Sequence, residues 1–337
     1  MKIAYFELGF TEYYEDYSIM PKRYGGGPIF ARWAKEMLNN AEHQFFIFAP
    51  AKCFDNLMKN ERRDRCVPVS EEALTLLQLG VPLKQIFPRI DEFDIVCHHH
   101  TRFGFNKKNL SIPVVHWSGF GVGGAGHKNN DYILLFDHNS KAIFGEKQKY
   151  VRIGKTVPLT FKEQNKSDFI FQCTRHDELI NTIDIAKECI AEKITGYFAG
   201  PIDSKYNLLD YIDNKNTFYV GIIPEQIKLE YTKAARLYTL PAKFDVNFNL
   251  SVVEANGFGT PVLASNRGWF KDYIKHGLNG YFYNSNLKEI FDLAKNANQQ
   301  ACWESASEFS IPKMVDSFTT AFQEILYEQR NSHNSKH

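Results

Sequence analysis

Apolar and polar positions in the first half of the chain follow the order strand, helix, strand. An apolar run at residues 2–6 predicts a buried strand, and residues 44–49 predict a second one. Between them, Pro28 suits the first turn of a helix. The apolar positions that follow recur on one helical face, and they are Ile29, Phe30, Trp33, Met37 and Leu38. Further strands are predicted at residues 93–97, 113–117 and 132–136.

A second series of strands and helices follows a polar run at residues 162–166, which has the composition of a linker. Strands are predicted there at residues 169–172, 195–199, 218–220, 237–240 and 261–264. Helices are predicted at residues 177–192, 251–256 and 313–329. This alternation predicts an α/β protein with two Rossmann-like parallel-sheet domains facing a central cleft. We place the N-terminal domain at residues 1–162 and the C-terminal domain at 163–312, with helix 313–329 packing back on the first.

The composition is that of a globular protein, with 337 residues of which 44% are hydrophobic and 23% charged. A net charge of +1 gives no reason to expect nucleic acid as a partner. The chain starts without a signal-peptide pattern, and no run of about 18 apolar residues predicts a membrane span. The six cysteines are scattered, which is typical of a reduced, cytoplasmic protein. Peripheral membrane contact through the first domain stays open.

Aromatic residues make up 15% of the chain. Such an excess fits a well-filled core, and it also fits surfaces that bind sugars, since aromatic rings are rigid and apolar with polar handles. The long segment from Glu7 to Arg23 is rich in tyrosine and follows the first strand. It is expected either to form an acceptor-binding lip or to cover the sheet as an Ω-loop.

A glycine-rich loop, Gly25-Gly26-Gly27, stands at the start of the first helix. Ligands of an open parallel sheet bind beyond the carboxyl ends of its strands, where helix N-termini offer N–H groups to phosphate. Glycine would let the backbone approach such a ligand closely. The alternative is a loop tip that only begins a helix.

Residues 249–254 form a second candidate site for a phosphorylated ligand. Asn249 suits a helix N-cap, and Leu250 and Ser251 would present N–H groups to a diphosphate. Glu254 could accept hydrogen bonds from both hydroxyls of a ribose. Ser251 and Glu254 also have the spacing of a capping box, in which Glu254 would only secure the helix.

Three consecutive histidines, His98-His99-His100, raise the question of a metal site. Neighbouring residues of a strand point in opposite directions, and no carboxylate or cysteine completes a ligand set. We therefore expect no metal, and we expect one of these histidines to line the cleft near a sugar.

Ordered motifs extend from Tyr219 to Phe282. They read Tyr219-Val220-Gly221, Tyr231-x-x-Ala234-Ala235-Arg236, Ser251-Val252-Val253-Glu254-Ala255, Gly259-Thr260-Pro261-Val262-Leu263-Ala264, Gly268 and His276-Gly277-Leu278-Asn279-Gly280-Tyr281-Phe282. Their order and spacing closely resemble the donor domain of family 4 retaining glycosyltransferases (glycosyl transferases group 1). Upstream, Gln172-Cys173-Thr174-Arg175-His176-Asp177 resembles the phosphate-clamp segment of that family. The Gly25-Gly26-Gly27 loop and residues 41–45 are similar to its glycine loop and second strand.

The resemblance implies a GT-B fold and roles for individual residues. Glu254 matches the glutamate that holds the donor ribose, and Arg175 matches the arginine of the phosphate clamp. The backbone of Leu250 and Ser251 falls where the diphosphate binds, while Gly221 and Ile222 border the base. His100 and His116 stand near the position of a first-domain histidine, which itself aligns with Gly119, and we count both as candidate catalytic residues.

The chain departs from the family pattern at several positions. Val246 replaces the glutamate that contacts the transferred sugar, with Asp245 beside it as a candidate substitute. Ile180 replaces the clamp lysine, and Asp272 replaces a glutamate after Gly268.

The resulting functional expectation is a glycosyltransferase that uses a nucleotide diphosphate sugar, with a UDP type favoured. It would transfer the sugar to a hydroxyl of a glycan or lipid-linked acceptor, with retention and without a metal or other cofactor. A catalytically silent relative that serves as a partner or regulatory subunit is the alternative, motivated by Val246 and Ile180. A different GT-B enzyme, such as a nucleotide-sugar epimerase, is a third hypothesis.

Overall fold

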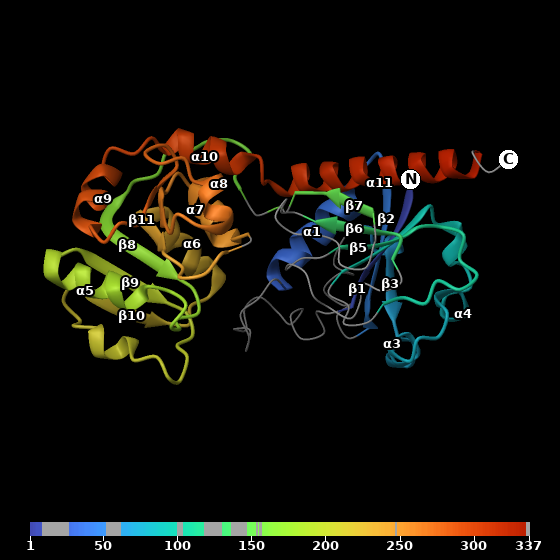
Figure 1. Cartoon of the computed structure of the whole chain (residues 1–337), viewed down its shortest axis with the longest axis horizontal. Coiled ribbons are helices and arrows are strands. Elements are labelled where there is room, and N and C mark those ends of the chain that lie inside the picture. The colour runs from blue at the N-terminus through green and yellow to red at the C-terminus, as the bar shows by residue number, and fades with distance from the viewer. Residues whose placement is uncertain are drawn as a thin grey trace. The chain divides into compact units, whose positions relative to one another are not determined.

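The chain divides into two compact units, each built on its own sheet (Figure 1). The computed structural model describes residues 1–8, 27–51, 62–99, 104–117, 130–135, 147–152, 154, 157–246 and 248–334. The first unit combines Met1–Gly154 with Ile311–His337, and the second is Lys155–Ser310. The polar run at residues 162–166 therefore lies inside the second unit, and the C-terminal helix belongs to the first.

The described part of the first unit holds a seven-stranded parallel sheet in the order β3-β2-β1-β4-β5-β6-β7. Its strands are β1 (Lys2–Glu7), β2 (Gln44–Pro50), β3 (Cys66–Val69), β4 (Ile95–His99), β5 (Val114–Trp117), β6 (Tyr132–Leu135) and β7 (Lys147–Tyr150). The pattern of apolar residues did not predict β3 or β7. β7 has the polar sequence Lys-Gln-Lys-Tyr and forms an edge of the sheet, so it carries no hydrophobic signal.

Helices cover both faces of this sheet. They are α1 (Gly27–Asn39), α3 (Glu71–Gln78), α4 (Leu83–Ile86) and α11 (Ile311–Asn334). On one face, Trp117 of β5 packs against Trp33 of α1 and Phe318 of α11, with ring centroids 5.0 and 4.9 Å apart. On the other face, Leu77 of α3 and Leu83 of α4 join a core that contains Phe6 and Phe105.

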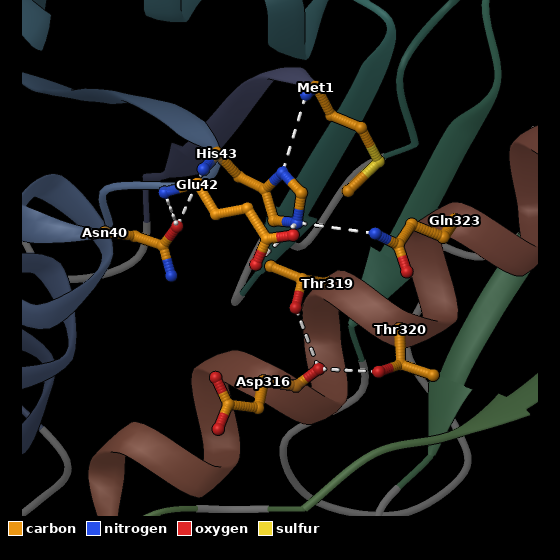
Figure 2. Close-up of polar contacts among 8 residues, drawn as sticks. All are labelled: Met1, Asn40, Glu42, His43, Asp316, Thr319, Thr320 and Gln323. Atoms are coloured by element: carbon orange, nitrogen blue, oxygen red, sulfur yellow. Dashed lines mark hydrogen bonds and ion pairs between the residues drawn. The ribbon is translucent and has the colours of Figure 1, made fainter.

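The amino end of the first sheet is tied to α11 through His43 (Figure 2). The His43 ring lies 3.5 Å from the amino group of Met1 and 3.5 Å from the Gln323 side chain of α11. Asn40 accepts hydrogen bonds from the backbone N–H groups of Glu42 and His43, which shapes the turn between α1 and β2. Residues 43 and 323 thus meet although 280 positions separate them.

The described part of the second unit holds a six-stranded parallel sheet in the order β10-β9-β8-β11-β12-β13. Its strands are β8 (Ser167–Cys173), β9 (Thr195–Ala199), β10 (Thr217–Gly221), β11 (Ala235–Leu240), β12 (Val262–Ala264) and β13 (Gly280–Phe282). Its helices are α5 (Thr182–Glu192), α6 (Glu225–Ala234), α7 (Leu250–Gly257), α8 (Gly268–Tyr273), α9 (Leu287–Ala294) and α10 (Gln299–Ser307). All five strands predicted for this half are present.

The two faces of the second sheet carry separate cores. Residues of α5 and α9, such as Ile185 and Phe291, pack on one face. Tyr231 of α6 and Val253 of α7 pack on the other. Both α6 and α7 start at the carboxyl edge of the sheet, because each follows a strand that ends there.

The helix predicted at residues 177–192 begins only at Thr182. Asp177 accepts a hydrogen bond from the backbone N–H of Leu179 at 2.9 Å, which closes a turn and keeps residues 177–181 out of the helix. Among the described residues, no helix has the length and apolar character required to cross a lipid bilayer.

A half-buried lysine, Lys166, joins the C-terminal ends of α6 and α7. Lys166 donates hydrogen bonds to the carbonyl oxygens of Lys233 and Phe258, at 2.8 and 3.1 Å, and to Thr260 Oγ1 at 2.5 Å. These carbonyls belong to the C-terminal ends of α6 and α7, where helix dipoles favour a cation. Lys166 therefore fixes the positions of two helices whose opposite ends lie at the carboxyl edge.

Candidate functional site

The switch point of the second sheet lies between β8 and β11. From β8 the chain adds β9 and β10 on one side, and from β11 it adds β12 and β13 on the other. The loops that leave β8 and β11 are joined by hydrogen bonds from Asn181 N to Pro241 O (2.9 Å) and from Lys243 N to Leu179 O (2.7 Å). Ligands of open parallel sheets bind at such a switch point, so these loops define the candidate site.

Arg175 lies in the loop after β8, and its side chain is 68% exposed. Its Nε atom and one terminal nitrogen both lie 2.8 Å from Oδ2 of Asp177. The ion pair holds the guanidinium in one direction while leaving most of its surface open to solvent. Arg175 therefore supplies an accessible cation at the carboxyl edge.

His176 anchors the same loop to the end of β9 and to the start of α5. Its Nε2 donates to Ala199 O at 2.9 Å, and its Nδ1 accepts from Thr182 Oγ1 at 3.1 Å. Burial lowers the pKa of His176 to about 4, so the ring is neutral at pH 7. The adjacent Gly200 has a φ of +118°, and a Cβ atom there would lie 1.9 Å from Thr174 O. Only glycine fits where this loop crosses the end of β9.

Asn249 caps helix α7, as the sequence predicted. Its side-chain oxygen accepts hydrogen bonds from the N–H groups of Ser251 and Val252, at 3.0 and 3.1 Å. The expectation that Ser251 presents a free N–H is therefore wrong for this structure, because Asn249 already uses that group. Leu250 is the first residue of the helix and remains the better candidate for an amide that meets a diphosphate.

Glu254 is not part of a capping box. The cap is Asn249 rather than Ser251, and the Glu254 carboxylate lies 2.8 Å from Nζ of Lys228 on α6. Lys228 also lies 2.7 Å from Glu225 in the first turn of the same helix. Burial disfavours the ammonium ion, but the two carboxylates outweigh this effect and raise the pKa of Lys228.

Lys228 was not identified from the sequence. The one available signal was its place in the first turn of a helix that follows the Gly221-Ile222 turn. Nothing in the local pattern linked it to Glu254, which is 26 residues away in the chain and on another helix.

The Gly221-Ile222 turn lies at the end of β10. Gly221 has a φ of +73°, and its carbonyl oxygen accepts a hydrogen bond from Gly200 N at 2.8 Å. The Ile222 side chain is 44% exposed, so it offers an apolar surface beside the N-terminus of α6. This placement is compatible with a border for a nucleotide base.

Two of the positions at which the chain departs from the family pattern, 246 and 180, are part of the core. Val246 and Ile180 are buried in the same hydrophobic cluster. Trp269 N donates to Val246 O at 2.7 Å, which fixes the Val246 backbone. Asp245, in contrast, is exposed. The described structure thus offers neither a carboxylate at position 246 nor a cation at position 180.

The first unit has a different set of polar side chains at its own switch point, between β1 and β4. At one face, His98 lies 2.7 Å from Asn130 and 3.3 Å from His116. At the other, His99 lies 2.6 Å from Glu7, and its ring stacks on Trp117 with centroids 3.8 Å apart.

The alternation of His98 and His99 between faces is the one expected for neighbouring strand residues. His116 is buried rather than open, although it lies close to the carboxyl edge. His100, Gly25 and Gly26, together with most of the segment from Glu7 to Arg23, lie outside the described residues. Gly27 is described only as the first backbone position of α1. Among the described side chains, no group of three or more His, Cys, Asp or Glu is arranged to hold a metal ion.

Comparison with known proteins agrees with this architecture. Residues 174–299 match the family model of glycosyl transferases group 1. An uncharacterized 41.2 kDa protein in the cps region of Klebsiella pneumoniae is 28% identical over 157 residues, which are 44% of this chain and 42% of that protein. The match thus spans less than half of the length of that relative.

Two solved structures cover almost the whole chain. A glycosyltransferase from Rickettsia africae aligns with a TM-score of 0.69 and 13% identity, over 96% of this chain and 98% of that one. Anabaena HepE in complex with UDP and glucose aligns with a TM-score of 0.64 and 15% identity, over 96% and 100%. The predicted fold class is confirmed: the chain has a GT-B fold, and the match to the group 1 glycosyl transferase model lies within its second unit.

Proposed function

We propose that this protein transfers a sugar from a nucleotide diphosphate sugar to a hydroxyl of a glycan or lipid-linked acceptor. The observation that carries the proposal is the arrangement at the switch point of the second sheet. There a buried carboxylate (Glu254), a capped helix start (Asn249, Leu250) and an accessible guanidinium (Arg175) belong to adjoining segments.

Each group has a chemical task in this proposal. Glu254 accepts hydrogen bonds from the ribose hydroxyls of the donor. The N-terminus of α7 and Arg175 stabilise the negative charge that develops on the departing diphosphate. Ile222 borders the base, and a UDP-type donor is favoured because HepE, which shares the fold, was crystallised with UDP and glucose.

The proposed reaction retains the anomeric configuration and needs no metal, since Arg175 and the helix dipole neutralise the leaving group. His116 and His100 are proposed to act on the acceptor side, and peripheral contact with a membrane is compatible with a lipid-linked acceptor. These features extend the family resemblance to this chain.

The test is calorimetric titration of the protein with UDP, GDP, ADP and their common sugar conjugates. We expect one nucleotide to bind selectively, and Glu254→Gln to weaken that binding at least about tenfold, since a hydrogen bond to a charged group contributes about 1.5–3 kcal/mol. Glu230→Gln is the matched control, because Glu230 is an exposed, ion-paired glutamate of α6. Unchanged affinity of Glu254→Gln for every nucleotide would refute the assignment.

A catalytically silent partner or regulatory subunit is the second candidate. The observation in its favour is that Val246 and Ile180 are buried in the core, and their apolar side chains can donate no hydrogen bond to a sugar or a phosphate. Absence of nucleotide binding in the same titration, and of donor hydrolysis or transfer, would favour this function over the first.

A further inference from the structure

Three charged side chains meet where helices α6 and α7 leave the carboxyl edge of the second sheet. Nζ of Lys228 lies 2.7 Å from Oε2 of Glu225 and 2.8 Å from Oε2 of Glu254. The Glu254 side chain is only 1% exposed and that of Lys228 13%. We refer to these three residues as the Lys228 cluster.

Burying the charges of this cluster costs free energy unless they form ion pairs with one another. An ionised carboxylate in a buried position needs an opposite charge or hydrogen-bond donors. Lys228 provides both to Glu254, and Glu225 keeps Lys228 protonated from its other side. Replacing Lys228 with an apolar residue would remove this ion pair, and the Glu254 carboxylate would no longer be held in its present direction.

The position of the cluster connects it with the donor. Lys228 lies six residues after Ile222, in the first turns of the helix that starts beside the proposed base-binding surface. Glu254 lies on the helix whose N-terminus is proposed to face the diphosphate. An ionised carboxylate has about four acceptor positions, so Glu254 can hold Lys228 and also accept from ribose hydroxyls.

We propose that Lys228 is a positioning residue of the donor site, which holds the Glu254 carboxylate directed toward the ribose of the nucleotide. The proposal rests on the function proposed above. It makes a specific claim about selectivity: the preference for a ribonucleotide over its 2′-deoxy analogue depends on Lys228, although Lys228 itself need not contact the ligand.

The test compares UDP with 2′-deoxy-UDP by calorimetry, or the corresponding pair for whichever base the titration above selects. The wild type should prefer the ribonucleotide by at least about tenfold, the equivalent of one charge-assisted hydrogen bond. In Lys228→Met this preference should fall to about twofold or less, because UDP loses more affinity than the 2′-deoxy analogue, which has only its 3′ hydroxyl to offer to Glu254. Lys228→Arg, which retains the charge, should recover most of the preference.

Lys233→Met is the matched control, because Lys233 belongs to the same helix and pairs with Glu230 at an exposed site. It should leave both affinities unchanged. If Lys228→Met does not fold at the assay temperature, Lys228→Gln is tested instead, since it keeps a hydrogen-bond donor for Glu254 but removes the charge. It should lose the preference as well.

The possible failures are distinguishable. A wild type that binds no nucleoside diphosphate overturns the proposed function together with this inference. A Lys228→Met protein that keeps the full ribose preference overturns only the positioning role. Equal losses for UDP and 2′-deoxy-UDP also overturn it, because they would mean that Lys228 contacts a part of the nucleotide that both ligands share.

Discussion

The two sheets of this protein share a topology but differ in the side chains at their switch points. In the second unit, charged groups stand on loops and helix starts, where Arg175 pairs with Asp177 and Lys228 pairs with Glu254. Among the described residues of the first unit, His98, His99 and Glu7 belong to strands and are all buried. The comparison shows that the sheet order fixes where a site forms, while the residues after each strand decide its chemistry.

The difference agrees with the proposed function, in which the second unit binds the donor and the first binds the acceptor. Phosphate and ribose are recognised by formal charges, which the second unit displays. A neutral acceptor hydroxyl requires hydrogen bonding and shape, which histidine and aromatic rings supply. Substitutions in the second unit should therefore affect donor binding, and substitutions in the first unit should not.

The largest expected effect is that of Arg175→Gln. If Arg175 stabilises the departing diphosphate, transfer should fall about 10²–10³-fold, as it does when one stabilising group for a developing charge is removed. The rate of sugar transfer from the selected donor is the measurement. Arg89→Gln is the control, because Arg89 makes a similar two-nitrogen contact with Glu92 on the surface of the first unit. Equal rates in the two variants would exclude a catalytic role for Arg175.

The next largest effect is expected at His176, which should make the stability of the second unit sensitive to acid. The pKa is about 4 in the folded chain, below the ordinary value of 6.5, so the unfolded chain binds the proton first as the pH falls. The neutral ring therefore makes its full contribution to the free energy of unfolding above pH 6.5. This contribution, up to about 3 kcal/mol, is lost progressively as the pH falls toward 4.

Urea unfolding of wild type and His176→Gln between pH 7 and pH 4.5 measures this contribution. The difference in stability between the two proteins should shrink as the pH falls. A difference that is constant with pH would show that His176 is not held neutral by the fold.

The smallest of the three effects is expected for Lys166→Met. The variant leaves the carbonyls of Lys233 and Phe258 without this donor, but it also removes the cost of a buried amine whose pKa burial lowers to about 7. We expect a net loss of about 2 kcal/mol. Hydrogen exchange should show reduced protection in residues 157–310 and unchanged protection in the first unit. Lys162→Met, at an exposed position of the same polar run, should change neither.

The sequence predicted the strands with continuous apolar runs, because burial on both faces of a parallel sheet leaves a strong signal. It did not predict β7, which is polar, or β13, which has only three residues. The start of α5 was placed five residues too early, since apolar spacing cannot reveal the turn closed by Asp177. Secondary structure was thus predictable where hydrophobic pattern alone decides it.

The candidate site was predictable only in part. Asn249 was identified as a cap because its residue type and its place before an apolar run are local signals. The partner of Glu254 was not, since an ion pair between two helices depends on how they pack against the sheet. The same limit applies to Val246 and Ile180, whose burial follows from tertiary packing and not from their immediate neighbours.

The return of α11 to the first unit has a consequence for folding during synthesis. Phe318 and Phe322 of this helix complete a core with Trp117 and Phe45, residues made far earlier. A ribosome that has released residues 155–310 has provided every described strand of the second sheet, whereas the first still lacks one of the helices over one of its faces. The second unit can therefore reach its native state first, and the N-terminal segment must wait for the synthesis of α11 before its own apolar face is fully covered.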